Sequence, residues 1–276
     1  MRKIRRTRLD SLLVELGYFE SREKAKLEIM AGNVYVNDQL ILKPSRLVNI
    51  GSKIEVRKRD VYVSRGAYKL KGAVEDLGLD VKDKIACDIG ASTGGFTQVL
   101  LELGAKKVYA VDVGRGQLHW KLRNDTKVVV MEKVNARYLK RSDFPEDIQV
   151  ITCDVSFISI SKILPSIFEI LVEGGEGLIL VKPQFEAPRE YIRKGLIRNM
   201  NVHIEVLKSL ATEITNNNFS ILGLTFSKIK GQKGNIEYFY KIKKESIPQN
   251  LVNDKNIEEI VSTAWKSLDL KEGVNK

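Results

Sequence analysis

The stretch IACDIGASTGGFTQVLLELG, residues 85–104, contains the pattern that decides the fold of most of this chain. Residues 85–89 form a short apolar run typical of a buried strand, and the small, glycine-rich residues that follow form a turn. Residues 96–104 then have the apolar spacing of a helix. In open α/β sheets, ligands bind where a parallel strand turns into a helix. The stretch therefore predicts a ligand site at the carboxyl end of a first parallel strand.

The glycine spacing of this turn excludes two common phosphate-binding loops. GASTGG does not have the G-x-G-x-x-G spacing of dinucleotide-binding proteins, and no Gly-Lys-Ser/Thr follows it as in a P-loop. What remains is the strand–Asp–x–Gly–x–x–x–Gly pattern of S-adenosylmethionine enzymes, although a tight turn without a ligand is the alternative interpretation. We therefore expect S-adenosylmethionine as the cofactor. The candidate residues in the turn are Asp88, Gly90, Ser92, Thr93, Gly94, Gly95 and Phe96.

Further strands and helices alternate downstream of the turn. We expect strands at residues 107–113, 128–131, 150–155 and 177–181, a helix at 160–172, and two last strands at 220–227 and 237–243. Repeated strand–helix units imply a parallel sheet with helices on both faces. The polar loop KIKGQKGN between the last two strands is typical of a hairpin connection. The expected fold class is α/β, a Rossmann-like S-adenosylmethionine-dependent methyltransferase sheet.

Polar side chains recur at the predicted strand ends. Asp112 ends the second strand, where a carboxylate can accept hydrogen bonds from both hydroxyls of a ribose. Asn135 follows the third strand and is a candidate for the adenine edge of the cofactor, although a turn residue without a ligand is an equally good interpretation. Asp154 ends the fourth strand, near the expected methionine end of the cofactor.

Four charged residues fall at positions that such a sheet brings together: Lys69, Asp154, Lys182 and Glu237. Lys182 directly follows a buried apolar strand, so its ammonium group must emerge at the carboxyl edge of the sheet. A ribose hydroxyl is a poor nucleophile that needs a base or strong local positive charge. Lys182 is the candidate for either role, and the two carboxylates would orient the lysines. A lone lysine at a strand end is more often an ordinary surface residue.

The N-terminal stretch RLDSLLVELGYFESREKAKLEIMAGNVYVND, residues 8–38, predicts two helices, the second capped by Ser21, followed by a small sheet. The stretch resembles the S4 family of RNA-binding domains, an α+β fold. The net charge of +11 also favours a polyanionic partner. The alternative interpretation is that the basic side chains of this stretch only form a solvated helix face. The candidate RNA-binding residues are Arg5, Arg6, Arg8, Arg22, Lys24, Lys26 and Arg65.

The motifs SRGAYKL, DIGASTGGFT, VDVG, CDVSF, LVKPQFE and GNIEYF occur in the order found in the TlyA family, which the chain resembles along nearly its whole length. Members join an S4 domain to a methyltransferase domain similar to FtsJ. The resemblance implies 2′-O-methylation of ribosomal RNA, typically at cytidine, with Lys69, Asp154, Lys182 and Glu237 as a catalytic tetrad. Residues 60–63 depart from an Arg-x-Trp-Val pattern of the family, which puts coupling through the linker in doubt. Asn199 stands where many members carry Asp.

These observations predict an S4-like domain over residues 1–59, a linker over 60–66, a methyltransferase domain over 67–246 and a C-terminal tail over 247–276 with one helix. We expect ribosomal RNA or ribosomal subunits as partners in the cytoplasm, with no metal site and no membrane span. Residue patterns do not decide between a monomer and a weak dimer. The alternatives are a non-catalytic RNA-binding or ribosome-assembly factor and a haemolysin-like membrane-active protein.

Overall fold

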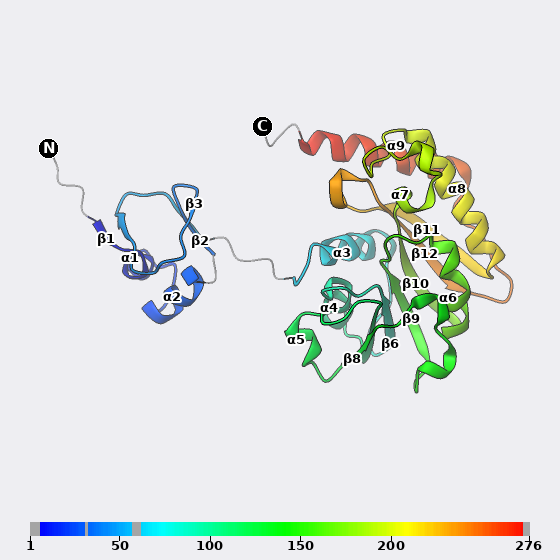
Figure 1. Cartoon of the computed structure of the whole chain (residues 1–276), viewed down its shortest axis with the longest axis horizontal. Helices are drawn as coiled ribbons and strands as arrows, with labels where there is room; N and C mark the ends of the chain where they lie inside the picture. Colours follow the sequence, from blue (N-terminus) through cyan, green and yellow to red (C-terminus); the bar gives the residue numbers. More distant parts are fainter. Residues whose placement is uncertain (1–5, 31–32, 57–61, 273–276) are drawn as a thin grey trace. The chain divides into compact units, whose positions relative to one another are not determined.

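A computed structural model describes residues 6–30, 33–56 and 62–272, and the chain divides into two compact units, Met1–Val61 and Tyr62–Lys276 (Figure 1). Arg5, and the first two residues of the unusual linker tetrapeptide, Asp60 and Val61, lie outside the described residues. The expectations for these three residues therefore stay predictions.

The smaller unit contains two helices and two small sheets. Ser21 begins the second helix as predicted, since its Oγ accepts a hydrogen bond from the Lys24 amide at 3.2 Å. Asn37 and Asp38 form a turn between β2 and β3, with φ of 49° and 63°. The pairing of β1 with β4 was not predicted, because both strands have only three residues and little alternation. The elements are β1 (Arg6–Arg8), α1 (Leu9–Glu15), α2 (Arg22–Met30), β2 (Val34–Val36), β3 (Gln39–Leu40), β4 (Leu47–Asn49) and β5 (Ile54–Val56).

The larger unit is built on a seven-stranded sheet with the order β11-β12-β10-β9-β6-β7-β8. The five strands from β6 to β10 run parallel to one another. Strand β12 runs antiparallel to both of its neighbours, β10 and β11. This arrangement confirms the α/β class and the hairpin between the last two strands. The strands are β6 (Ile85–Ile89), β7 (Lys107–Asp112), β8 (Val128–Glu132), β9 (Ile148–Cys153), β10 (Leu171–Val181), β11 (Phe219–Phe226) and β12 (Tyr238–Lys244).

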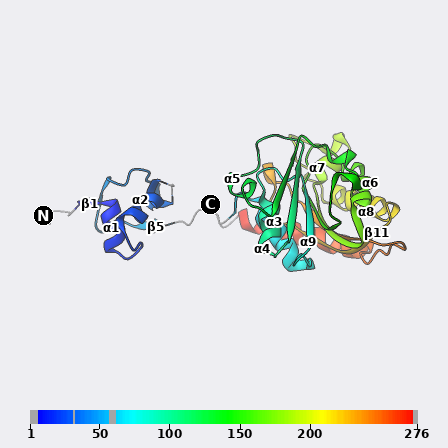
Figure 2. The same ribbon diagram turned by 90° about the horizontal axis from the view of Figure 1, so that it is seen from below.

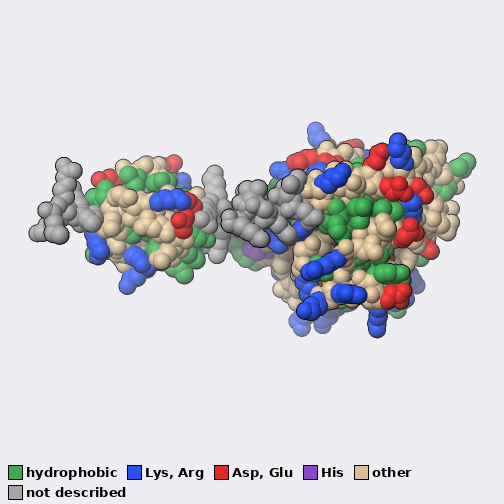
Figure 3. Space-filling view, turned by 90° about the horizontal axis from the view of Figure 1, so that it is seen from above, with side chains coloured by type: hydrophobic (Ala, Val, Ile, Leu, Met, Phe, Trp, Pro, Cys, Tyr) green, Lys and Arg blue, Asp and Glu red, His purple; other side chains and the backbone are tan. Residues whose placement is uncertain are grey.

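Helices cover both faces of this sheet (Figures 1 and 2). Helices α3 and α4 contribute to one apolar core, and α6, α8 and α9 contribute to a larger core on the opposite face. On the face drawn in Figure 3, basic and acidic side chains are mixed. The helices are α3 (Gly66–Leu77), α4 (Gly95–Glu102), α5 (Trp120–Arg123), α6 (Leu164–Ile170), α7 (Pro183–Glu186), α8 (Met200–Asn216) and α9 (Asp254–Glu272), with 3₁₀ turns η1 (Ala136–Tyr138), η2 (Arg141–Asp143), η3 (Ile160–Lys162), η4 (Arg189–Tyr191) and η5 (Gln232–Gly234).

The helix expected over residues 160–172 differs from the structure. A 3₁₀ turn, Ile160–Lys162, precedes α6, and α6 ends at Ile170 because β10 already begins at Leu171. The register of β10 against β9 shifts between Leu171 and Glu176. Apolar spacing alone does not reveal such an irregular strand start, so the sequence predicted only its regular part, residues 177–181.

Asn199 caps α8, one of the helices on the larger core. Its Oδ1 accepts a hydrogen bond from the Asn201 amide at 3.0 Å. Asn and Asp are about equally good at this position. The departure from the Asp of many relatives is therefore neutral for the fold.

The C-terminal helix α9 is linked to the sheet through His203 on α8. The ring of Trp265 on α9 meets the His203 ring at 5.4 Å between centroids, and His203 Nδ1 lies 3.0 Å from the Tyr238 hydroxyl on β12. Burial lowers the pKa of His203 from 6.5 to about 4. The imidazole is therefore neutral in the folded protein at pH values where the unfolded chain already binds a proton.

We expect this histidine to make the folded larger unit sensitive to acid. A pKa lowered by folding adds stability that is complete above pH 6.5 and is lost as the pH falls toward 4. The shift corresponds to about 3 kcal/mol. Urea unfolding of the chain and of His203→Gln, measured between pH 7 and 4, checks this expectation. The variant should show a shallower decline, and equal slopes would contradict the assignment.

Candidate active site

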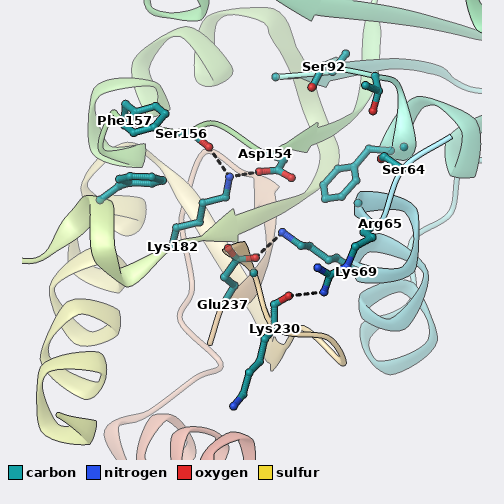
Figure 4. Close-up of a pocket in the computed structure, with 18 of the residues that line it drawn as sticks. Ser64, Arg65, Lys69, Ser92, Asp154, Ser156, Phe157, Lys182, Lys230 and Glu237 are labelled. Atoms are coloured by element: carbon teal, nitrogen blue, oxygen red, sulfur yellow. Dashed lines mark hydrogen bonds and ion pairs between the residues drawn. The ribbon is translucent and has the colours of Figure 1, made fainter. Parts of the chain in front are cut away.

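Two adjoining pockets open at the carboxyl edge of the sheet. The first has a volume of about 420 Å³ and contains the four predicted tetrad residues (Figure 4). The second has a volume of about 500 Å³ and extends over the ends of β7 and β8. The two pockets share one wall, formed by Gly90, Ser92, Asp154, Ser156 and Phe157. A ligand in one pocket would therefore lie against a ligand in the other.

The four tetrad residues form two ion pairs in the first pocket (Figure 4). Lys182 Nζ lies 2.5 Å from Asp154 Oδ1 and donates a hydrogen bond to Ser156 Oγ at 2.7 Å. Lys69 Nζ lies 2.6 Å from Glu237 Oε2. Lys182 and Glu237 are buried, and Lys69 is nearly so. Such enclosed pairs hold positive charge at fixed points beside the pocket, where solvent screens it little.

The sheet topology explains why these residues meet. Asp154 and Lys182 directly follow β9 and β10, which are parallel neighbours, so both emerge at the same edge. Glu237 directly precedes β12. Because β12 runs antiparallel to β10, the start of β12 lies at that edge too. Lys69 comes from α3 and completes the second pair.

Asp88 lies beneath the glycine-rich turn and lines neither pocket. Its fully buried carboxylate accepts hydrogen bonds from Thr97 Oγ1 at 2.6 Å and Thr152 Oγ1 at 3.0 Å. Burial raises the pKa of Asp88 to about 7. Gly94 also lines neither pocket, whereas Ser92, Thr93, Gly95 and Phe96 line the first. Asp88 therefore supports the turn from below.

Asp112 and Asn135, the two candidates at strand ends, line the second pocket. Asp112 accepts hydrogen bonds from the amides of Ser92 at 2.8 Å and Gly114 at 2.7 Å, one on each carboxylate oxygen. Each oxygen has a further acceptor site, so the carboxylate can still bind two hydroxyl groups. Asn135 Oδ1 accepts from the Arg137 amide at 3.1 Å. Its NH₂ group has no hydrogen-bond partner among the described residues.

Among the predicted RNA-binding residues that the structure describes, only Arg65 lines the first pocket. Its Nη2 donates to the Lys230 carbonyl at 3.0 Å (Figure 4). The other described candidates belong to the smaller unit. Arg8 and Arg22 both pair with the buried Asp10, at 2.7 and 3.3 Å, and the hydrogen bond from Arg8 is the main cause that lowers the pKa of Asp10 to about 2.

The remaining candidates of the smaller unit are engaged at its surface. Lys24 lies 3.4 Å from Glu20, and Lys26 lies 3.9 Å from Glu23. Arg6 Nε donates to Asn49 Oδ1 at 3.2 Å. Contacts of this kind between exposed groups are weak, so an RNA phosphate could replace them.

Sequence reasoning missed two parts of the first pocket. Phe157 has a positive φ of 63° and is 90% exposed, and its ring lies 5.0 Å from that of Phe185. Gly231 lies against Glu237, since a Cβ at this position would be 2.0 Å from Glu237 Oε1. In the sequence, the contact between Gly231 and Glu237 was indicated only by a glycine within the lysine-rich loop KIKGQKGN.

Over the described ranges, no group of three His, Cys, Asp or Glu side chains is placed to hold a metal ion. None of the helices in those ranges is long and apolar enough to cross a membrane. Cys87 and Cys153 are buried free thiols.

Comparisons with known proteins agree with the two units. The FtsJ-like methyltransferase profile matches residues 62–244, and the S4 domain profile matches residues 7–54. A candidate rRNA methyltransferase of Bacillus subtilis is 44% identical over 97% of both chains. The 16S/23S rRNA (cytidine-2′-O)-methyltransferase TlyA of Mycobacterium tuberculosis is 35% identical over 94% of this chain and 97% of its own. A solved structure from Streptococcus thermophilus, described as a candidate hemolysin, is 44% identical, with a TM-score of 0.77, over 98% of this chain and 99% of that one.

Proposed function

Because the chain belongs to the TlyA family of FtsJ-like rRNA methyltransferases, we propose that it methylates a ribose 2′-hydroxyl of ribosomal RNA, at a cytidine, with S-adenosylmethionine as the methyl donor. The observation that carries this proposal is the ion pair between Lys182, which lines the first pocket, and Asp154, which belongs to the wall shared by the two pockets. A nucleophile bound in the first pocket would meet a donor bound in the second at this wall.

The residues of the second pocket fit S-adenosylmethionine. Asp112 has free acceptor sites for the two ribose hydroxyls, and Asn135 has a free NH₂ group for the adenine edge. Gly90 lines both pockets and packs so closely on the Asp154 backbone that a Cβ would not fit there. When bound, the cofactor supplies an activated methyl group on a sulfonium. In this assignment Asp112 and Asn135 bind and orient the cofactor, and Asp88 holds the glycine-rich turn in place.

In the first pocket, Lys182 would bind the 2′-oxygen of the ribose. The ammonium has three donors, and Asp154 and Ser156 engage two of them, which leaves one for the substrate. The ion pair with Asp154 fixes the position of this ammonium group. We therefore assign Lys182 the role of stabilising the oxygen as it loses its proton, and Asp154 is the base beside it. Lys69, held by Glu237, adds a second positive charge to the same pocket.

The smaller unit would bind ribosomal RNA through its exposed cations. Arg8 and Arg22 keep about half of their side-chain surface exposed while Asp10 fixes their position. Cations that neutralise phosphates release counterions, so binding should weaken steeply with salt. This partner also places the protein in the cytoplasm, where ribosomes are assembled.

The test is transfer of radiolabelled methyl from S-adenosylmethionine to ribosomal subunits from a strain that lacks the protein. We expect label at one ribose, detected as a bond that resists alkaline cleavage. An absence of label despite demonstrated cofactor binding would favour the non-catalytic assembly factor. Leakage of liposomes caused by the pure protein would favour the haemolysin-like alternative.

A further inference from the structure

Three surface segments meet at the outer edge of the second pocket. Glu132, at the end of β8, accepts hydrogen bonds from the Gly116 amide at 2.8 Å and from the Arg123 side chain. The Lys133 amide donates to the Gly114 carbonyl at 3.0 Å. These contacts join residues 113–117, 119–123 and 132–138 into one continuous surface, which we call the rim.

Two large aromatic rings project from the rim into solvent. Trp120, the first residue of α5, is 64% exposed, and Tyr138 in η1 is 67% exposed. A cation lies over each ring. Lys121 Nζ is 5.9 Å from the ring centroid of Trp120, and the Arg137 guanidinium is 5.8 Å from the ring centroid of Tyr138. The His119 ring stacks on Trp120 at 5.8 Å and 30°. Neither ring packs into the core, so the packing of the fold does not explain why aromatic side chains stand at these two positions.

The charge of the rim is positive and largely uncompensated. Arg115, Lys121, Lys133 and Arg137 are exposed, and none of the four pairs with a carboxylate within the described residues. Arg123, in contrast, forms an ion pair with Glu132. An exposed cluster of one sign attracts a polyanion.

We propose that the rim is a binding surface for single-stranded RNA, on which a nucleobase flanking the methylated nucleotide stacks against Trp120. Aromatic faces interleaved with free cations are how proteins hold unpaired bases and their phosphates. The rim is continuous with the second pocket, because Gln117 and Asn135 line that pocket and belong to the rim. The main chain also ties the two together, since the His119 amide donates to the Thr93 carbonyl of the glycine-rich turn at 3.2 Å. The proposal rests on the proposed function only in taking RNA as the substrate.

Tryptophan fluorescence provides a direct test. The chain has two tryptophans, so in Trp265→Phe all indole emission comes from Trp120. We expect a single-stranded oligocytidylate of about 12 nucleotides to quench this emission, with an apparent affinity that falls as salt rises. A duplex RNA of the same length should quench less. Unchanged emission at saturating oligonucleotide, with binding shown by sedimentation, would overturn the proposal.

The second measurement uses methyl transfer to ribosomal subunits by the full chain. Trp120→Ala should raise KM for subunits about tenfold and leave kcat and cofactor affinity unchanged, as expected from the loss of one stacked base. Trp120→Phe should largely restore KM, because it keeps an aromatic face. Lys266→Ala, an exposed cation on α9, is the matched control and should have no effect.

The outcomes separate this proposal from the proposed function. Quenching by RNA without any methyl transfer would support the rim and contradict the enzymatic assignment. Normal KM in Trp120→Ala, together with intact methyl transfer, would overturn the rim and leave the assignment standing. A shift of Trp120→Ala from dimer to monomer in sedimentation, without loss of RNA affinity, would instead identify the rim as a contact between two copies and overturn the proposal.

Discussion

Lys182→Ala is expected to reduce methyl transfer to ribosomal subunits by about 10³-fold or more, while cofactor affinity stays within about twofold of the parent. The substitution removes the ammonium group that the first pocket places against Asp154, a residue of the wall shared by the two pockets, and leaves Asp154 without this partner. The second pocket is formed by other side chains, so the cofactor should still bind. Radiolabel transfer and calorimetric titration with S-adenosylmethionine measure the two effects separately.

A matched control distinguishes a catalytic role from the general cost of breaking an enclosed ion pair. Lys241 on β12 pairs with Glu176 at 3.0 Å and is also largely enclosed, but it lines neither pocket. Lys241→Ala should lower stability and leave turnover per folded molecule unchanged. Lys182→Ala with turnover within tenfold of the parent would contradict the role assigned to Lys182.

Much of the fold follows from local patterns in the sequence. The apolar run at residues 85–89 and the small residues after it predicted the first strand and the turn correctly, because a buried parallel strand and a tight turn each impose strict residue choices. The start of β10 and the pairing of β1 with β4 were missed. Their hydrogen bonds depend on neighbouring strands and leave little trace in side-chain spacing.

The tetrad residues were predicted as a group, but their pairing was not. Parallel strand ends meet at one edge, so Asp154 and Lys182 were expected to lie close together. Lys69 pairs with Glu237 because β12 lies beside β10 and runs antiparallel to it, which brings the start of β12 to the same edge of the sheet. Local residue patterns do not reveal this pairing of distant strands. Phe157 had no signal, because its φ of 63° is imposed by the surrounding structure.

Gly90→Ala is expected to weaken S-adenosylmethionine binding by about 100-fold, or ~3 kcal/mol, and to abolish detectable methyl transfer. Gly90 has a φ of 83°, and a Cβ there would lie 2.3 Å from the backbone carbonyl oxygen of Asp154. That oxygen cannot rotate away like a flexible side chain. The clash would therefore displace the turn, the Asp154 backbone or both, and with them the wall shared by the two pockets.

Gly174→Ala separates this clash from backbone strain. Gly174 also has a positive φ, 76°, but a Cβ there meets nothing within 4 Å, and it lies on β10 outside both pockets. Both variants bear the cost of a left-handed alanine, about 1–2 kcal/mol, and only Gly90→Ala adds the clash. Thermal unfolding should show a loss of stability in both variants, larger in Gly90→Ala, and calorimetric titration with the cofactor should show a loss of binding in Gly90→Ala alone. If Gly90→Ala binds the cofactor as tightly as Gly174→Ala, the turn does not hold the cofactor, because a displaced Asp154 carbonyl could not leave such a site intact.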